Sequence, residues 1–194
     1  YESIYSQKKM KSSGLQRTSS MTAMIDRKKR PIEPASQQAR ARMREYVEAH
    51  GGSSPIHTIL IANNGMAATK AMLSLREFAF DVLGDAKALT FVAMASGQDL
   101  DANAEFVRLA DRVVEVPSGS NKNNYANVEL IIDVAEREAV DAVWPGWGHA
   151  SEYPELPDGL AKRNITFIGP SGGPMRALGD KIAASILAQT ARVS

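Results

Sequence analysis

The sequence predicts an α/β fold: a Rossmann-like parallel sheet preceded by a disordered basic leader. Short apolar runs recur along the chain and are typical of buried strands. The segments between them are longer, and their apolar residues are spaced as on one face of a helix. Strands that alternate with helices form βαβ units, which join parallel strands through right-handed crossovers.

The expected elements follow this alternation from residue 58 onward. In order they are a strand at 58–62, a helix at 66–83, a strand at 89–95, a short helix at 103–110, a strand at 113–116, a helix at 125–137, a strand at 141–144, a weak helix at 156–163, a strand at 166–169 and a helix from 179 onward. Asn63-Asn64-Gly65 predicts the turn from the first strand into the first helix. Asn124 is the expected cap of the helix at 125–137.

Composition and charge exclude several classes of protein. The net charge is +1, and the chain has no cysteine, which excludes disulfides and thiolate metal sites. Residues 1–50 hold 11 Lys/Arg against 5 Asp/Glu, so the remainder is mildly acidic. An acidic body argues against a nucleic-acid partner. No apolar run reaches the roughly 18–20 residues that span a bilayer, so we expect no transmembrane segment.

Two domains are expected: a disordered, basic, regulatory leader at 1–52 and an α/β lobe at 53–194. The leader is too polar to bury enough apolar surface to offset the entropy of ordering, except for a short helix at 36–49. The chain opens on Tyr1 and stops at Ser194 without a clear domain end, so we expect truncation at both ends.

Loops that follow strands should gather on one edge of the sheet, where ligands bind in such folds. The loop 145–152 is the most informative, because Gly146 and Gly148 let the backbone approach a ligand closely. His149 and Glu152 add proton transfer and hydrogen bonding, although the two side chains could instead only brace each other. No second His or carboxylate stands at metal-ligand spacing, so no metal site is expected in this chain.

Lys181 opens the last expected helix, where the helix dipole disfavours a cation. A bound phosphate would explain a lysine at that place; a solvent-exposed lysine is the alternative. In the leader, Ser20 has Arg17 three residues before it and apolar anchors on both sides, as basophilic protein kinases require. The Ser- and Lys/Arg-rich stretch 3–25 also fits an organelle transit peptide.

Five segments, in this order, resemble the opening of the biotin carboxylase domain in eukaryotic-type, multidomain acetyl-CoA carboxylases. They are Ile61–Lys70, Asp99–Glu105, Asn123–Val128, Gly146–Glu152 and Leu178–Ile182. Bacterial biotin carboxylases and the pyruvate and propionyl-CoA enzymes typically read Asn-Arg-Gly-Glu at the first turn and Tyr-Gly-Phe in the later loop. Met66 and Trp147 therefore favour the acetyl-CoA carboxylase branch.

The resemblance implies a ligase of fatty acid biosynthesis. ATP, with Mg²⁺ or Mn²⁺, and bicarbonate would carboxylate biotin on a carrier domain, and a carboxyltransferase would then make malonyl-CoA. The fold would be the lobe that precedes the ATP-grasp lid. Lys181 would contact the ATP phosphate, Gly65, Gly146 and Gly148 would shape the edge near nucleotide and bicarbonate, and Glu152 would support the active site, with His149 beside it.

The resemblance also extends to the leader and to the expected partners. Ser19-Ser20-Met21-Thr22 stands where animal enzymes carry a kinase target; Thr22 aligns with that target, whereas Ser20 has the better-spaced anchors. The lid, the metal carboxylates, the bicarbonate site and the biotinyl lysine are expected beyond Ser194, so the chain alone should be inactive. The full-length enzyme is expected to be a homo-oligomer in the cytoplasm, with the plastid as alternative. The competing hypotheses are a non-catalytic Rossmann-like regulatory module and another biotin-dependent carboxylase.

Overall fold

Five parallel strands form the centre of a computed structural model, which describes residues 35–193. The strands are β1 (Thr58–Ile61), β2 (Thr90–Ser96), β3 (Arg112–Val116), β4 (Ala142–Trp144) and β5 (Thr166–Phe167). They lie in the order β3-β2-β1-β4-β5, and all pairs are parallel. The predicted α/β class and parallel sheet are therefore confirmed.

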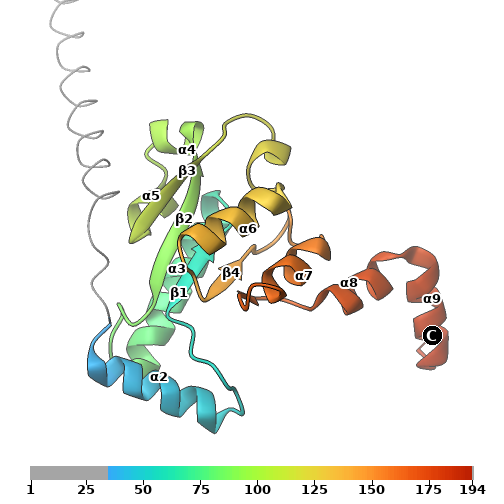
Figure 1. The fold of residues 1–194 in the computed structure, drawn as a ribbon, viewed down its shortest axis with the longest axis horizontal. Helices are drawn as coiled ribbons and strands as arrows, with labels where there is room; N and C mark the ends of the chain where they lie inside the picture. The colour runs from blue at the N-terminus through green and yellow to red at the C-terminus, as the bar shows by residue number, and fades with distance from the viewer. Residues whose placement is uncertain (1–34, 194) are drawn as a thin grey trace, which may run out of the picture. The chain divides into compact units, whose positions relative to one another are not determined.

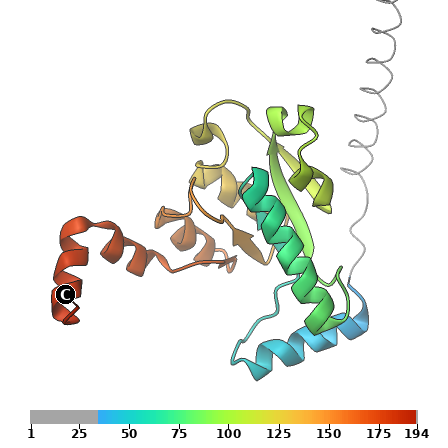
Figure 2. The same cartoon turned by 180° about the vertical axis from the view of Figure 1, so that it is seen from behind.

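Helices lie on both faces of this sheet, and the last two project away from it (Figures 1 and 2). They are α2 (Gln37–Ala49), α3 (Gly65–Leu83), α4 (Gly97–Asp101), α5 (Glu105–Leu109), α6 (Val128–Arg137), α7 (Glu155–Ala161), α8 (Gly172–Gly179) and α9 (Lys181–Thr190). The chain crosses from β1 to β3 over the face that holds α3 and α5. It returns to β4 and β5 over the opposite face, which α6 and α7 cover.

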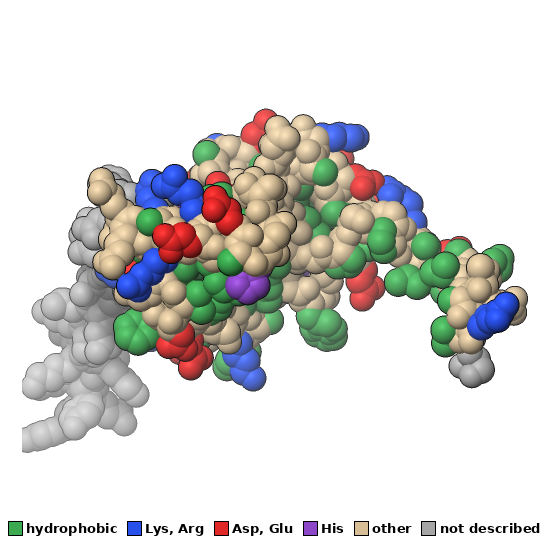
Figure 3. Space-filling view, turned by 90° about the horizontal axis from the view of Figure 1, so that it is seen from below, with side chains coloured by type: hydrophobic (Ala, Val, Ile, Leu, Met, Phe, Trp, Pro, Cys, Tyr) green, Lys and Arg blue, Asp and Glu red, His purple; other side chains and the backbone are tan. Residues whose placement is uncertain are grey.

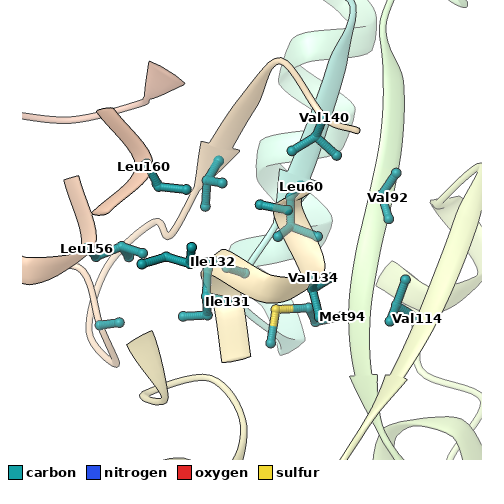
Figure 4. Close-up of a cluster of buried hydrophobic side chains, with 14 of the residues drawn as sticks. Leu60, Val92, Met94, Val114, Ile131, Ile132, Val134, Val140, Leu156 and Leu160 are labelled. Atoms are coloured by element: carbon teal, nitrogen blue, oxygen red, sulfur yellow. The ribbon is translucent and has the colours of Figure 1, made fainter. Parts of the chain in front are cut away.

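The core between the sheet and α6/α7 follows from the alternation of side chains along each strand. Leu60, Val92, Met94 and Val143 point to that face and are buried there. Figure 4 shows Leu60 and Met94 on the side of the sheet that faces α6 and α7. These two helices contribute Ile131, Ile132, Val134, Leu156 and Leu160 to the same cluster. β2 lies inside the sheet and all seven of its residues are buried, as the apolar run Phe91–Ala95 predicts.

Helix α2 packs on α3 in the described part of the chain. Ala39 and Met43 are its buried residues, and Arg42 donates to the carbonyl of Leu83 at 3.3 Å. Tyr46 meets Phe78 edge to face with 5.4 Å between ring centroids. The helix expected at 36–49 therefore forms and is attached to the body, while the predicted disorder of the leader falls almost wholly outside the described residues.

Four local predictions need correction. The helix after β3 starts at Val128, and Asn127 caps it in place of Asn124, accepting from the amide of Leu130 at 3.0 Å. Asn124 bonds the Pro117 carbonyl and the Tyr125 amide instead, which stabilises a turn before the helix. α4 forms where no helix was expected, because Ser96 and Asp99 make a capping box. α8 also forms unexpectedly, so only its successor α9 corresponds to the expected last helix.

Candidate functional site at the carboxyl edge of the sheet

The reversal of strand order lies between β1 and β4. From β1 the chain proceeds outward to β2 and β3, and it then crosses to β4 and β5 on the other side. In open α/β sheets, ligands bind in the crevice beyond the carboxyl ends of the strands at such a reversal. The loops after β1 and β4 are therefore the first place to look for a site.

Asn63 joins these two loops. Its side chain is buried, and Nδ2 donates to the carbonyl of Pro145 at 2.6 Å and to that of Trp147 at 3.0 Å. Its Oδ1 accepts from the Asn64 amide at 2.8 Å. One amide thus fixes the backbone of both loops. The prediction that the loops after β1 and β4 lie together is confirmed by these contacts.

Three glycines expected at the edge take left-handed backbone conformations. Gly65, the first residue of α3, has φ +59°, and Gly146 and Gly148 have φ +64° and +75°. A Cβ at Gly146 would meet the indole of Trp144 at 2.5 Å, so a side chain there is excluded by space as well as by conformation. At Gly65 and Gly148 no atom lies within 4 Å of a built Cβ, which leaves the backbone open to a ligand.

In the same loop, the side chain of His149 packs against a neighbour, whereas that of Glu152 is exposed. His149 has φ +52°, which is uncommon for a residue with a side chain. Its ring packs against that of Tyr125 with 5.5 Å between centroids, and burial lowers the pKa of its imidazole. Glu152 is exposed and makes no hydrogen bond or ion pair with His149. The two side chains therefore do not brace each other.

A buried polar network beneath His149 was not expected from the sequence. The Tyr125 hydroxyl donates to Asp99 Oδ2 at 2.7 Å, and the Ser96 amide donates to the same oxygen at 3.0 Å. Burial, followed by the hydrogen bond to Asp99, raises the pKa of Tyr125 well above its usual value, so the phenol stays protonated. The Ser96-x-x-Asp99 spacing is the one sequence signal that could have located it.

Lys181 does not join this edge. It is the exposed first residue of α9, whose N-cap Asp180 accepts from the Ala183 amide at 2.7 Å. α9 packs on α8 and has no buried residue, and Figures 1 and 2 show it away from the ends of β1 and β4. Lys181 makes no ion pair with any residue of 35–193. Its predicted contact with a phosphate stays a prediction.

The structure adds little on the remaining predicted features, which are the phosphorylation sites, a metal site and a membrane span. Ser20 and Thr22 lie outside the described residues. Among residues 35–193, no three His, Cys, Asp or Glu side chains are grouped so as to hold a metal ion. Over the same residues, no helix combines the length and the apolar character needed to cross a bilayer.

Comparisons with known proteins agree with this arrangement. Residues 55–175 match the family described as biotin carboxylase, N-terminal domain. The chain is 57% identical over 153 residues to acetyl-CoA carboxylase from Saccharomyces cerevisiae, and 58% identical over 149 residues to acetyl-CoA carboxylase 1 from Oryza sativa subsp. japonica. These matches cover 78% and 77% of the chain but only 7% of each relative.

Solved structures show the same fold at lower identity. A multifunctional pyruvate carboxylase from Rhizobium etli matches with a TM-score of 0.61 and 31% identity, over 72% of this chain and 13% of that one. The biotin carboxylase domain of a thermophilic 2-oxoglutarate carboxylase matches with a TM-score of 0.62 and 25% identity, over 71% and 28%. The sheet order, the joined loops at its carboxyl edge and these matches lead to one conclusion: the chain belongs to the biotin carboxylase N-terminal domain family.

Proposed function

We propose that the chain is the first lobe of the biotin carboxylase domain of an acetyl-CoA carboxylase. The enzyme uses ATP, with Mg²⁺ or Mn²⁺, and bicarbonate to carboxylate biotin on a carrier domain, and its carboxyltransferase passes the carboxyl group on to give malonyl-CoA. The observation that carries this proposal is an identity of 54–58% to acetyl-CoA carboxylases over 149–154 residues, from fungi and plants alike.

The proposed ligand contacts of the lobe lie in two places. At the edge by β1 and β4, the open backbone at Gly65 and Gly148 leaves room for a substrate, with Gly146 shaping the turn. His149 and Glu152 support that edge from the same loop. On α9, the ammonium of Lys181, which has no ion-pair partner among the described residues, contacts a phosphate of ATP, since a cation at a helix N-terminus favours an anion there.

The test uses the full-length carboxylase that contains this segment. Wild type should cleave ATP in a bicarbonate-dependent reaction and should form malonyl-CoA from acetyl-CoA. Lys181→Met should lower kcat/KM for ATP at least about tenfold, because a charge-assisted hydrogen bond of about 1.5–3 kcal/mol is lost. Lys162→Met, at another exposed lysine, is the matched control and should leave kcat/KM unchanged. A wild type without bicarbonate-dependent ATP cleavage would sink the enzymatic proposal in favour of a non-catalytic module.

We also propose a homo-oligomer that forms through the outer face of α3. Met66, Leu73 and Phe80 are spaced by seven residues and are 61%, 49% and 63% exposed. Lys70 and Glu77 are exposed between these three residues. Because each residue of an α-helix turns by about 100°, the five side chains form a stripe that spans less than a quarter of the helix circumference. An antiparallel pair about a two-fold axis between Leu73 and Ser74 places Lys70 of each copy opposite Glu77 of the other. The stripe is thus complementary to itself.

The proposal includes regulation of the enzyme through its leader. A protein kinase phosphorylates the leader at Ser20, with Thr22 as the second choice.

The enzyme works in the cytoplasm, and the plastid is the alternative. Fusing residues 1–52 to a fluorescent protein distinguishes the compartments, because a transit peptide would carry the fusion into the organelle whereas a regulatory leader would not.

A further inference from the structure

Asn64 and Gly65 form the only Asn-Gly pair in the chain. In such a pair the amide nitrogen of the glycine can attack the side-chain carboxamide of the asparagine, because glycine has no Cβ to hinder the approach and leaves the backbone free to turn. A folded protein prevents this reaction when it holds either group in hydrogen bonds. The surroundings of both groups in the turn after β1 therefore decide whether the pair is reactive.

The carboxamide of Asn64 has no hydrogen-bond partner among the described residues. Asn64 is the N-cap residue of α3, but its side chain makes no capping bond. The side chain is half-buried and Gly65 is exposed, so water reaches the turn. Asn63 is the contrast, because its buried side chain donates to two carbonyls and accepts from the Asn64 amide. The carboxamide of Asn63 is fixed, whereas that of Asn64 is free to rotate.

The amide nitrogen of Gly65 is also available. The first N–H groups of an α-helix have no acceptor within the helix, and the Gly65 N–H bonds no other group in residues 35–193. A built Cβ at Gly65 meets no atom within 4 Å, so this backbone has space to move. Asn64 is extended, with φ −131° and ψ −177°, and a partial rotation about its Cα–C bond brings the nitrogen toward Cγ. Both reacting groups are therefore accessible.

A second pair in the chain could close the same ring but is held by its surroundings. Asp158 and Gly159 lie within α7, and the Asp158 carboxylate forms an ion pair with Arg176. A Cβ at Gly159 would collide with Ile132, so the backbone there has no space to turn. Of these two pairs, only Asn64–Gly65 is free to react.

We propose that Asn64 is a site of spontaneous covalent modification, at which asparagine is converted into aspartate and isoaspartate. The Gly65 nitrogen forms a bond to Cγ of Asn64, the bond from Cγ to the side-chain nitrogen breaks, and ammonia leaves with the proton of the Gly65 amide. One water then opens the cyclic imide. Opening at Cγ gives aspartate, and opening at the main-chain carbonyl carbon gives isoaspartate, whose backbone runs through the side chain. The reaction needs no oxidant and no other reactant.

Either product places a new negative charge at the edge between β1 and β4. The effect of this charge on activity rests on the proposed function, in which ATP and bicarbonate bind at this lobe. Both substrates are anions, and like charges repel, so the modification weakens their binding. Isoaspartate also lengthens the main chain directly after Asn63, whose side chain joins the two loops.

The first measurement follows the 194-residue chain by peptide mass spectrometry while it is kept at neutral pH and physiological temperature. Aspartate and isoaspartate should accumulate at position 64 at a rate within about tenfold of that in a free peptide of residues 58–70. Asn63 and Asp158 are internal controls and should stay unchanged. Asn64→Gln should abolish the signal at this position, because glutamine closes the corresponding larger ring much more slowly. A folded chain that reacts at Asn64 more than about tenfold more slowly than the peptide overturns the proposal.

The second measurement tests the effect on the full-length carboxylase. Wild type should lose kcat/KM for ATP in proportion to the fraction modified at position 64, whereas Asn64→Gln should keep its own initial value through the same incubation. A wild type that is modified at Asn64 and keeps its kcat/KM for ATP and for bicarbonate overturns the effect on binding. A wild type that never cleaves ATP with bicarbonate refutes the carboxylase instead, and the mass spectra still decide the modification.

Discussion

Two neighbouring asparagines with the same chemistry have different structural roles in the turn after β1. The Asn63 side chain is buried and satisfies two carbonyls of the loop after β4. Asn64 stands at the start of α3, and its side chain makes no capping hydrogen bond. Position in the turn decides this: Asn63, two residues after β1 ends, points toward the loop after β4, whereas Asn64 is already the N-cap residue of α3.

We expect Asn63→Ala to lower the free energy of unfolding by about 2–4 kcal/mol, because two carbonyls lose their donor in a buried site. Asn64→Ala is the matched control and should cost less than about 1 kcal/mol. Urea denaturation followed by tryptophan fluorescence measures both. Equal effects of the two substitutions would show that the Asn63 link between the loops makes no special contribution to the free energy of unfolding.

His149 should make the stability of the lobe depend on pH. Burial lowers its pKa below the ordinary 6.5, so the unfolded chain binds a proton more readily than the folded one. The lobe therefore has its full His149 contribution above about pH 6.5 and loses it as the pH falls through the window below that value. His149→Asn, which suits a left-handed backbone, should remove this part of the pH dependence. An NMR titration that places the His149 pKa at or above 6.5 would contradict the argument.

At the scale of the element, α3 combines two faces of opposite character. One face carries Ala68, Met72, Ala79 and Leu83 into the core, and the other leaves Met66, Leu73 and Phe80 in solvent. The inner face follows from helical periodicity alone. The outer face has no partner in the described residues. Its exposed apolar side chains distinguish it from an ordinary solvated surface, and Lys70 and Glu77 give it charges of opposite sign.

Charge reversal tests the pairing proposed for that outer face. Lys70→Glu or Glu77→Lys alone should weaken self-association of the full-length enzyme about tenfold, since each variant brings like charges together twice in a two-fold pair. The double variant should restore association, because it exchanges the partners and keeps their attraction. Sedimentation velocity gives the association constants. If the double variant is as weak as either single one, the two residues do not face each other.

The molecule as a whole shows what a sequence can and cannot predict. Apolar runs such as 91–95 are buried along their whole length, so the strands and their parallel pairing follow from local pattern. Asn63 and Trp147 lie 84 positions apart, and their contact exists only after β1 and β4 pair. The Tyr125–Asp99 network depends on tertiary packing in the same way. α8 was missed because Gly172, Gly173 and Pro174 resemble a loop, although proline and glycine are tolerated in a first helical turn.

Phosphorylation of the leader is a prediction about the full chain. A basophilic kinase should label wild type and Thr22→Ala, and Ser20→Ala should lose most of the incorporated phosphate, because Arg17 and the apolar anchors are spaced for Ser20. Phosphopeptide mass spectrometry assigns the site. Label that persists in Ser20→Ala and disappears in Thr22→Ala would reverse the assignment.

The exposed packing of α9 makes this helix the place where local unfolding of the lobe should begin. α9 buries no side chain of its own, and Figure 3 shows hydrophobic groups on the surface at the α8–α9 end, where Leu178, Ile182 and Ile186 are exposed. Amide protons of α9 should therefore exchange with deuterium within moments, through fraying of this helix alone. Those of β2, enclosed between two strands and two layers of helix, should exchange only when the whole lobe unfolds. Within residues 35–193, the two elements should therefore differ widely in their resistance to local unfolding.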